Sequence, residues 1–184
     1  RLFGQRDSKG SVAAYKDALA GMKPDHPRRA RTIESLLSAQ YGEKAFKDCV
    51  DLAIAEVPKL TKGPSHVNAV YLGLACQQSA AAKEPWRLDA GEQLFALAPE
   101  ALKFDGILAD DKSGLYETLG DYLGDKGDKK GSTELAKQWL AFLEAEAAKA
   151  PTPAARAVFD PHRVNAALAS AQPEKVVDAL KKSE

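Results

Sequence analysis

The sequence predicts an all-α protein built from antiparallel helix pairs. Apolar residues recur every three or four positions in almost every segment, which is the spacing of one helix face, and no segment sustains the alternation of a strand. Prolines stand just before several of these stretches, where the first turn of a helix has no hydrogen bond to lose. Alanine and glycine at regular positions let neighbouring helices approach closely. An irregular helical bundle is the alternative fold.

The first half of the chain predicts four helices. The first covers residues 12–22 and is closed by Pro24, and the second opens near Pro27, runs to residue 41 and is broken by Gly42. The third covers residues 45–57 and ends at Pro58. The fourth, around residues 67–76, has apolar residues on two faces, so we expect it to be buried between neighbours.

The second half continues the same pattern. A helix is expected over residues 86–101 with an interruption near Pro99, followed by a looser stretch over residues 104–113. Further helices are expected over residues 115–123, 135–150, 158–171 and 174–182, which makes about nine in all. Thr152 and Asp160 are suitable N-caps for the helices that follow them.

Length, charge and hydropathy limit the classes of partner. The chain has 184 residues, and its 26 Lys and Arg balance 26 Asp and Glu, so it lacks the basic surface that nucleic acid or anionic membranes require. Its longest uncharged apolar run, residues 69–76, is too short to span a bilayer, which predicts no membrane insertion. Residues 1–184 are expected to form a single all-helical domain. Because the chain begins with Arg and stops within a helical pattern, we expect it to be a fragment of a longer protein.

Internal repeats appear at the positions that control helix packing. Four residues have the spacing of the first helix of a tetratricopeptide repeat (TPR): Tyr116, Leu119, Gly120 and Leu123. A second set resembles its second helix: Ala136, Leu140, Leu143 and Pro151. The connection between them, residues 125–132, is about four residues too long.

Weaker copies of this pattern occur elsewhere in the chain. One consists of Ala69, Leu72, Gly73 and Cys76, followed by Ala90, Leu94 and Leu97. Another consists of Leu36, Ala45, Cys49 and Leu52, ahead of Pro58. Residues 173–180 resemble the second helix of a further repeat. The chain therefore resembles a degenerate TPR-like helical repeat region.

The resemblance implies a TPR-like superhelix and a non-enzymatic function. Such a module binds a protein, a peptide or a neighbouring domain of the same parent chain along a concave groove, which the first helix of each pair lines. The repeat positions give a candidate concave face: Val67, Val70, Leu74, Gln77, Gln78, Glu117 and Asp121. The three apolar members can instead be core residues that the adjacent repeat covers.

A looser likeness concerns the helical regions that follow a thioredoxin domain in some exported bacterial proteins. The alanine-rich helices and the segment Pro-Glu-Lys-Val-Val at residues 173–177 carry it. It implies an alternative function, in which the chain is a helical extension of a redox enzyme, or of another enzyme, whose catalytic domain lies outside this chain. An exported or periplasmic location would fit, although the chain has no Cys-x-x-Cys motif.

The two cysteines form the most informative pair. Cys49 and Cys76 lie on consecutive helices at nearly equal distances from the hinge at residues 62–63, so they stand at similar heights. Two interpretations remain open, a disulfide and two buried thiols. A disulfide would imply an oxidising compartment.

No cluster of residues predicts a catalytic, cofactor or metal site. The three histidines, His26, His66 and His162, are dispersed and have no second ligand at metal-binding spacing. The glycine-rich run at residues 124–131 lacks the spacing of a phosphate-binding loop, and no strand precedes it. Trp86 and Trp139 are expected to be core anchors.

Overall fold

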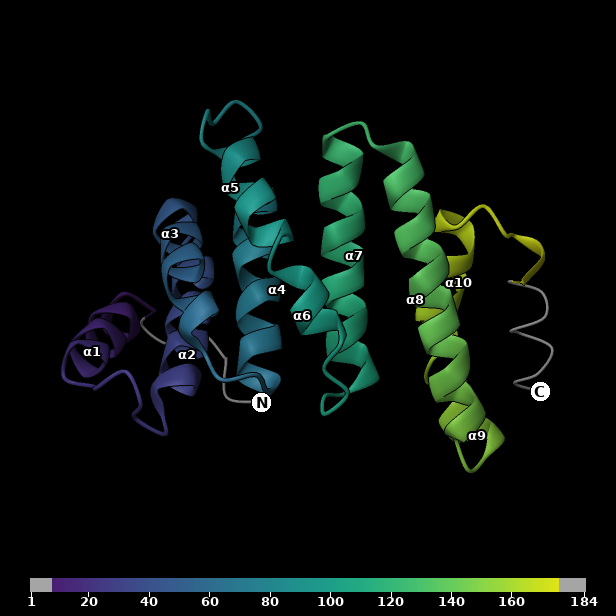
Figure 1. Ribbon diagram of the computed structural model, residues 1–184, viewed down its shortest axis with the longest axis horizontal. Coiled ribbons are helices and arrows are strands. Elements are labelled where there is room, and N and C mark those ends of the chain that lie inside the picture. The colour runs from purple at the N-terminus through teal and green to yellow at the C-terminus, as the bar shows by residue number, and fades with distance from the viewer. Residues whose placement is uncertain (1–7, 176–184) are drawn as a thin grey trace. The chain divides into compact units, whose positions relative to one another are not determined.

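The computed structural model describes residues 8–175, and within this range it contains helices and turns but no strand. The chain divides into two compact units, Arg1–Ile107 and Leu108–Glu184, which we describe separately (Figure 1). The single domain expected over the whole chain stays a prediction. None of the helices in the described range has the combination of length and apolar character needed to span a membrane.

The first unit contains a first helix, two helix pairs and two short elements (Figure 1). Its elements are α1 (Ser8–Ala20), α2 (Arg29–Gly42), α3 (Phe46–Glu56), the 3-10 turn η1 (Val57–Lys59), α4 (Pro64–Ser79), α5 (Arg87–Phe95) and α6 (Ala98–Leu102). Helix α2 packs against α1, α3 and α4. Helix α3 packs against α4 and α5, so each pair is continuous with the next.

The turn between α2 and α3 reverses the chain in three residues. Lys44 adopts a left-handed conformation with φ of 58°, and the backbone N–H of Ala45 donates to the carbonyl oxygen of Gln40 at 2.9 Å. This bond satisfies a carbonyl that the end of the helix would leave unpaired. The tight reversal therefore places α3 directly beside α2.

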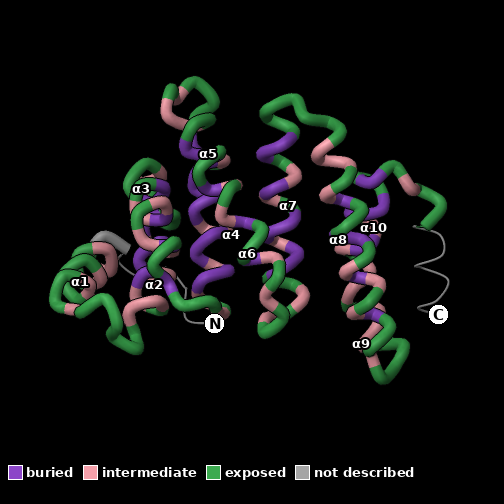
Figure 2. Tube along the Cα trace, viewed as in Figure 1, coloured by how far each residue is buried: buried purple, intermediate pink, exposed green. Residues whose placement is uncertain are grey.

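Helix α4 is the central helix of the first unit, because it packs against α2, α3, α5 and α6 (Figure 2). A Cβ atom at Gly73 would lie 2.7 Å from Cβ of Ala53 in α3 and 2.9 Å from Cδ2 of Leu94 in α5. Only glycine allows α4 to approach both neighbours this closely. The expectation that this helix is buried on more than one side is confirmed.

The second unit contains α7 (Ala109–Asp125), α8 (Lys129–Lys149), α9 (Pro153–Ala157) and α10 (Asp160–Ala169). Helix α8 packs against both α7 and α10. Trp139 of α8 is 4% exposed, and its indole N–H donates to Oγ of buried Ser113 in α7 at 3.0 Å. Trp139 is thus a core anchor of this unit.

A buried arginine joins α10 to α8. Arg163 is 2% exposed, and its Nε donates to Glu144 at 2.9 Å while its Nη1 donates to Asp160 at 2.8 Å. The guanidinium group is therefore compensated on two sides, as a buried charge requires.

Several helix boundaries differ from the sequence prediction. The connection between α7 and α8 is short rather than four residues too long, because α8 begins at Lys129. Gly127 makes the turn with φ of 75°, and the Asp128 carboxylate caps α8 by accepting the N–H of Gly131 at 2.8 Å. The sequence analysis missed this first turn of α8 because residues 125–132 are polar and glycine-rich and lack the apolar spacing of a helix.

Two further helix starts differ from the prediction, and one predicted N-cap is confirmed. Helix α7 begins at Ala109, inside the stretch expected to be loose, and its first turn carries Asp110 and Asp111, which suit a helix N-terminus. Thr152 is the predicted N-cap and accepts the N–H of Ala155 at 3.1 Å. Asp160 is the first residue of α10 rather than its cap. The helix predicted over residues 174–182 lies almost entirely outside the described residues.

Candidate functional site

Only one stripe of α4 is open to solvent. Its half-buried residues recur at helical spacing and include Ser65, Asn68, Leu72 and Ala75. The other sides are buried at residues such as Ala69 and Cys76. Any partner that contacts α4 must therefore reach it along this stripe.

A carboxylate from α2 joins this stripe to the neighbouring helix. Ser65 Oγ donates to Oε2 of Glu34 at 2.6 Å, and Asn68 Nδ2 donates to Oε1 at 2.9 Å. Glu34 and Ser38, one turn further along α2, are both half-buried. We name the surface formed by Glu34, Ser38, Ser65, Asn68, Leu72 and Ala75 the α2–α4 face.

Aromatic groups stand at one end of the α2–α4 face. Tyr41, at the end of α2, is 41% exposed, and its ring centroid lies 6.0 Å from that of Phe46. Ser79 Oγ lies 3.5 Å from the Tyr41 hydroxyl, a long hydrogen bond that joins the ends of α4 and α2. The face therefore combines small polar side chains with an exposed aromatic ring.

Most of the predicted concave residues of α4 are not on this face. Val67, Val70, Leu74 and Gln77 are 0% exposed, because α4 is packed on several sides. The three apolar residues thus follow the core interpretation that the sequence left open. For Gln77, the expectation of a surface position is wrong.

Gln77 has a structural role instead. Its Nε2 donates to the carbonyl oxygen of Arg87 at 2.9 Å, and Nε of Arg87 donates back to the carbonyl oxygen of Gln77 at 2.9 Å. These two bonds fix the start of α5 against the end of α4. Gln78, which is half-buried, offers its carbonyl oxygen to the same guanidinium group.

Glu117 and Asp121 lie one turn apart on the exposed side of α7, as the repeat pattern predicts for surface residues. Partial desolvation raises the pKa of Asp121, and the negative charge of Asp125, one turn further on, raises it further. We name Glu117, Asp121 and Asp125 the acidic face of α7. It belongs to the second unit, whereas the α2–α4 face belongs to the first.

Cys49 and Cys76 are joined by a disulfide, with a Cα–Cα distance of 6.2 Å. Both residues are fully buried, and the bond connects α3 to α4. Of the two interpretations that the sequence left open, the structure contains the disulfide.

The histidines do not come together. His66 is 2% exposed, and its Nδ1 has no hydrogen-bond partner within the described chain. Burial lowers the pKa of His66, and the nearby charge of Lys62 lowers it further. His162, in the second unit, bonds Asp110 at 2.6 Å. Across residues 8–175, no group of three or more His, Cys, Asp or Glu side chains is arranged to hold a metal ion.

The sequence analysis missed the residues that form the α2–α4 face. Ser65 and Asn68 are three residues apart on one side of a helix whose other positions are mainly apolar, and this spacing was a usable signal. Their partner Glu34 was not predictable from spacing, because it lies 31 residues from Ser65 in the chain.

Comparison with known proteins identifies the fold. No family model and no curated protein matches the sequence. The structure is similar to that of a kinesin light chain-like protein with nearly identical TPR-like repeats from Podosopora anserina, with a TM-score of 0.55 and 15% identity over 96% of this chain and 85% of that chain. A single-substitution variant of that protein gives a TM-score of 0.57 and 16% identity, over 96% of this chain and 84% of that one. The chain has an all-α, TPR-like repeat fold.

Proposed function

We propose that the chain is a non-enzymatic helical-repeat module that binds a segment of another protein, or of a neighbouring domain, along the open sides of its first helices. In the first unit the binding surface is the α2–α4 face. In the second unit it is the acidic face of α7. The TPR-like fold supports this function in general terms, because stacked helix pairs offer long surfaces suited to polypeptide binding.

One observation carries the proposal most strongly. The two oxygens of Glu34 hold Ser65 and Asn68 at the surface, so polar groups from two successive first helices form one fixed, partly open row. Fixed polar side chains reduce the ordering cost of binding a peptide. Leu72 and Ala75 add apolar area to the same row.

Charge predicts the composition of the bound segment. The carboxylates of the acidic face of α7 favour a partner with Lys or Arg at matching positions. Within the described residues, Glu117 and Asp121 form no ion pair with a Lys or Arg side chain, so both carboxylates are available to a partner.

The proposal can be tested with ligands selected from a random peptide library. Peptides that bind the wild-type chain are measured again with Asn68→Arg and with Glu117→Lys, both at accessible positions. Asp89→Arg, at an exposed position of α5, serves as the matched control. Each variant is first checked for helical content, so that a loss of binding is not caused by unfolding. Val70→Asp is not used, because it would bury a charge and unfold the first unit.

We expect Asn68→Arg or Glu117→Lys to weaken peptide binding about tenfold, which corresponds to about 1.4 kcal/mol. Asp89→Arg should leave binding unchanged. If all three folded variants bind the selected peptides as the wild type does, neither face is the binding surface.

The compartment can be inferred from the cysteines. The disulfide between two buried residues supports an oxidising location for this chain, which an exported or periplasmic protein would have. The alternative function, a helical extension of a redox or other enzyme, has no observation in its favour within the described residues. Activity assays on a longer gene product would test it.

A further inference from the structure

A groove of about 480 Å³ lies between α1 and α3, with α2 as its floor. Its apolar part consists of Ala20 and of one leucine from each helix: Leu19, Leu36 and Leu52. Helices α3 and α5, which flank α4 in the same way as α1 and α3 flank α2, pack against each other directly. The open groove is therefore a feature of the first part of this unit, large enough for an aliphatic chain.

Acceptor groups gather at one end of the groove. Asp48 and Asp51 line it from α3, three residues apart on one side of the helix. Gln40 lines it from α2 and is only 2% exposed, yet its Oε1 accepts no hydrogen bond within the described chain. A buried acceptor without a donor is costly, and a donor placed in the groove would remove that cost.

The chain shows which kind of group this rim accepts. The ammonium group of Lys16, on α1, lies 3.3 Å from Oδ2 of Asp48. Asp51 holds the ammonium group of Lys47 at 2.5 Å, from outside the groove lining. Both lysines are about half exposed, so each ion pair is weak and exchangeable.

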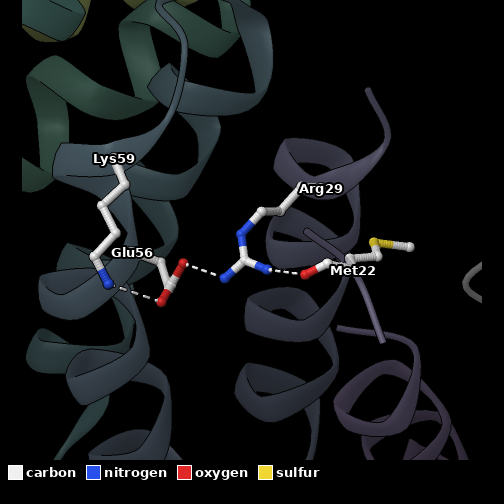
Figure 3. A network of polar contacts seen from close by, with 4 residues as sticks. All are labelled: Met22, Arg29, Glu56 and Lys59. Atoms are coloured by element: carbon white, nitrogen blue, oxygen red, sulfur yellow. Dashed lines mark hydrogen bonds and ion pairs between the residues drawn. The ribbon is translucent and has the colours of Figure 1, made fainter. Parts of the chain in front are cut away.

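The opposite end of the groove is fixed by an arginine (Figure 3). Arg29 donates to Oε2 of Glu56 at 2.8 Å and to the carbonyl oxygen of Met22 at 3.2 Å. Burial alone would raise the pKa of Glu56, but the hydrogen bonds from Arg29 and Lys59 outweigh it and hold the pKa below its usual value. This network ties the start of the α1–α2 connection and the first residue of α2 to α3, so it holds the groove walls in place.

We propose that this groove binds an aliphatic ammonium group. The hydrocarbon chain lies on the three leucines, and the ammonium group donates to Asp51, Asp48 and Gln40. A carboxylate ligand would be repelled by Asp48 and Asp51 at the same end. A neutral alcohol could donate to Gln40, but it could not take the place of the lysine ammonium groups that pair with the two carboxylates. The lysine side chain of a bound polypeptide and a free diamine both carry this chemistry.

The groove is separate from the α2–α4 face. Leu36 and Gln40 are each offset by two residues from Glu34 and Ser38, which places them on the opposite side of α2. The two proposals can therefore fail independently.

The test is a titration followed by NMR of the leucine methyl groups. Pentane-1,5-diamine represents a free amine, and a short alanine peptide with one central lysine represents a polypeptide side chain. Pentan-1-ol and pentanoate are the neutral and anionic controls. We expect saturable shifts at Leu19, Leu36 and Leu52 with at least one amine, and binding of the alcohol that is about tenfold weaker.

Two variants make the test decisive because they act in opposite directions. Asp51→Asn removes an acceptor charge and should weaken amine binding about tenfold, whereas Lys16→Ala removes the competing ammonium group and should strengthen it. Both positions are exposed enough to leave the fold intact, and Asp89→Asn is the control that should change nothing. Tighter binding of the peptide than of the diamine would assign the site to a polypeptide partner, and the reverse to a free amine. Absence of saturable binding by both amines, or equal binding of pentanoate, would overturn the proposal.

Discussion

Helices α4 and α7 carry the same packing signature but use it differently. Gly73 and Gly120 occupy the same place in the two copies. A Cβ atom at Gly73 would collide with Ala53 and Leu94, whereas a Cβ atom at Gly120 would have no atom of its unit within 4 Å. Cys76 in α4 forms a disulfide, and its counterpart Leu123 in α7 is a buried core residue.

The difference shows what a repeat signature determines. It places a helix as the first of a pair, but the number of neighbours decides which of its residues remain open. Helix α4 packs on four other helices of its unit and keeps one narrow stripe, while α7 exposes a full acidic side. Residues at equivalent positions, such as Val70 and Glu117, therefore lie in the core in one helix and at the surface in the other.

The largest effect is expected from the disulfide. Its loop spans 27 residues, so its reduction, or the double change Cys49→Ala and Cys76→Ala, should lower the free energy of unfolding of the first unit by about 3 kcal/mol. Denaturation followed by Trp86 fluorescence in a Trp139→Phe background reports on this unit alone. The second unit, followed through Trp139 in a Trp86→Phe background, should not change. A titration that finds two free thiols in the unreduced, denatured chain would contradict the disulfide.

The matched glycines give the next effect. Gly73→Ala should destabilise the first unit by about 1–3 kcal/mol, because the added methyl group would push α3 and α5 away from α4. Gly120→Ala should stabilise the second unit by about 0.5–1 kcal/mol, since it only removes the entropy cost of a helical glycine. Equal changes of the same sign in both units would remove the distinction between α4 and α7.

A pH effect sharpens the same comparison. His66 at the start of α4 has a lowered pKa in the folded chain, so the unfolded chain binds its proton first as the pH falls. Stability of the first unit should therefore be fully present above about pH 6.5 and decrease as the pH falls below it. Denaturation monitored by Trp86 on both sides of this pH measures the change. His66→Gln should remove most of it, and an unchanged pH dependence would exclude His66 as its source.

The last effect concerns Trp139 in the second unit. Trp139→Phe removes the donor to Ser113 Oγ and leaves a buried hydroxyl with one partner fewer, which should cost about 1 kcal/mol. Ser113→Ala combined with Trp139→Phe should cost less than the two single changes added together. Calorimetry of the four chains measures this coupling, and strict additivity would mean that the hydrogen bond contributes nothing.

The sequence predicted the helical class and the repeat pattern because both depend on local spacing. The Leu-Gly position of α4 and the amphipathic pattern of α8 are examples, since each needs only neighbours along one helix. The α2–α4 face was not predictable in the same way. It depends on Glu34 meeting Ser65 and Asn68 across two helices, and on four neighbours that bury Val70 and Leu74. A single sequence contains no local signal for either arrangement.

Thiol labelling tests the central claim, the narrow open stripe of α4, most directly. Single cysteines are introduced by Asn68→Cys, Val70→Cys and Glu117→Cys and are labelled without reductant, so that the native disulfide stays intact. We predict rapid labelling at positions 68 and 117 and protection at position 70 in the folded chain, with equal labelling of all three after denaturation. Labelling of Val70→Cys as fast as Asn68→Cys in the folded chain would show that this side of α4 is open and would contradict the account.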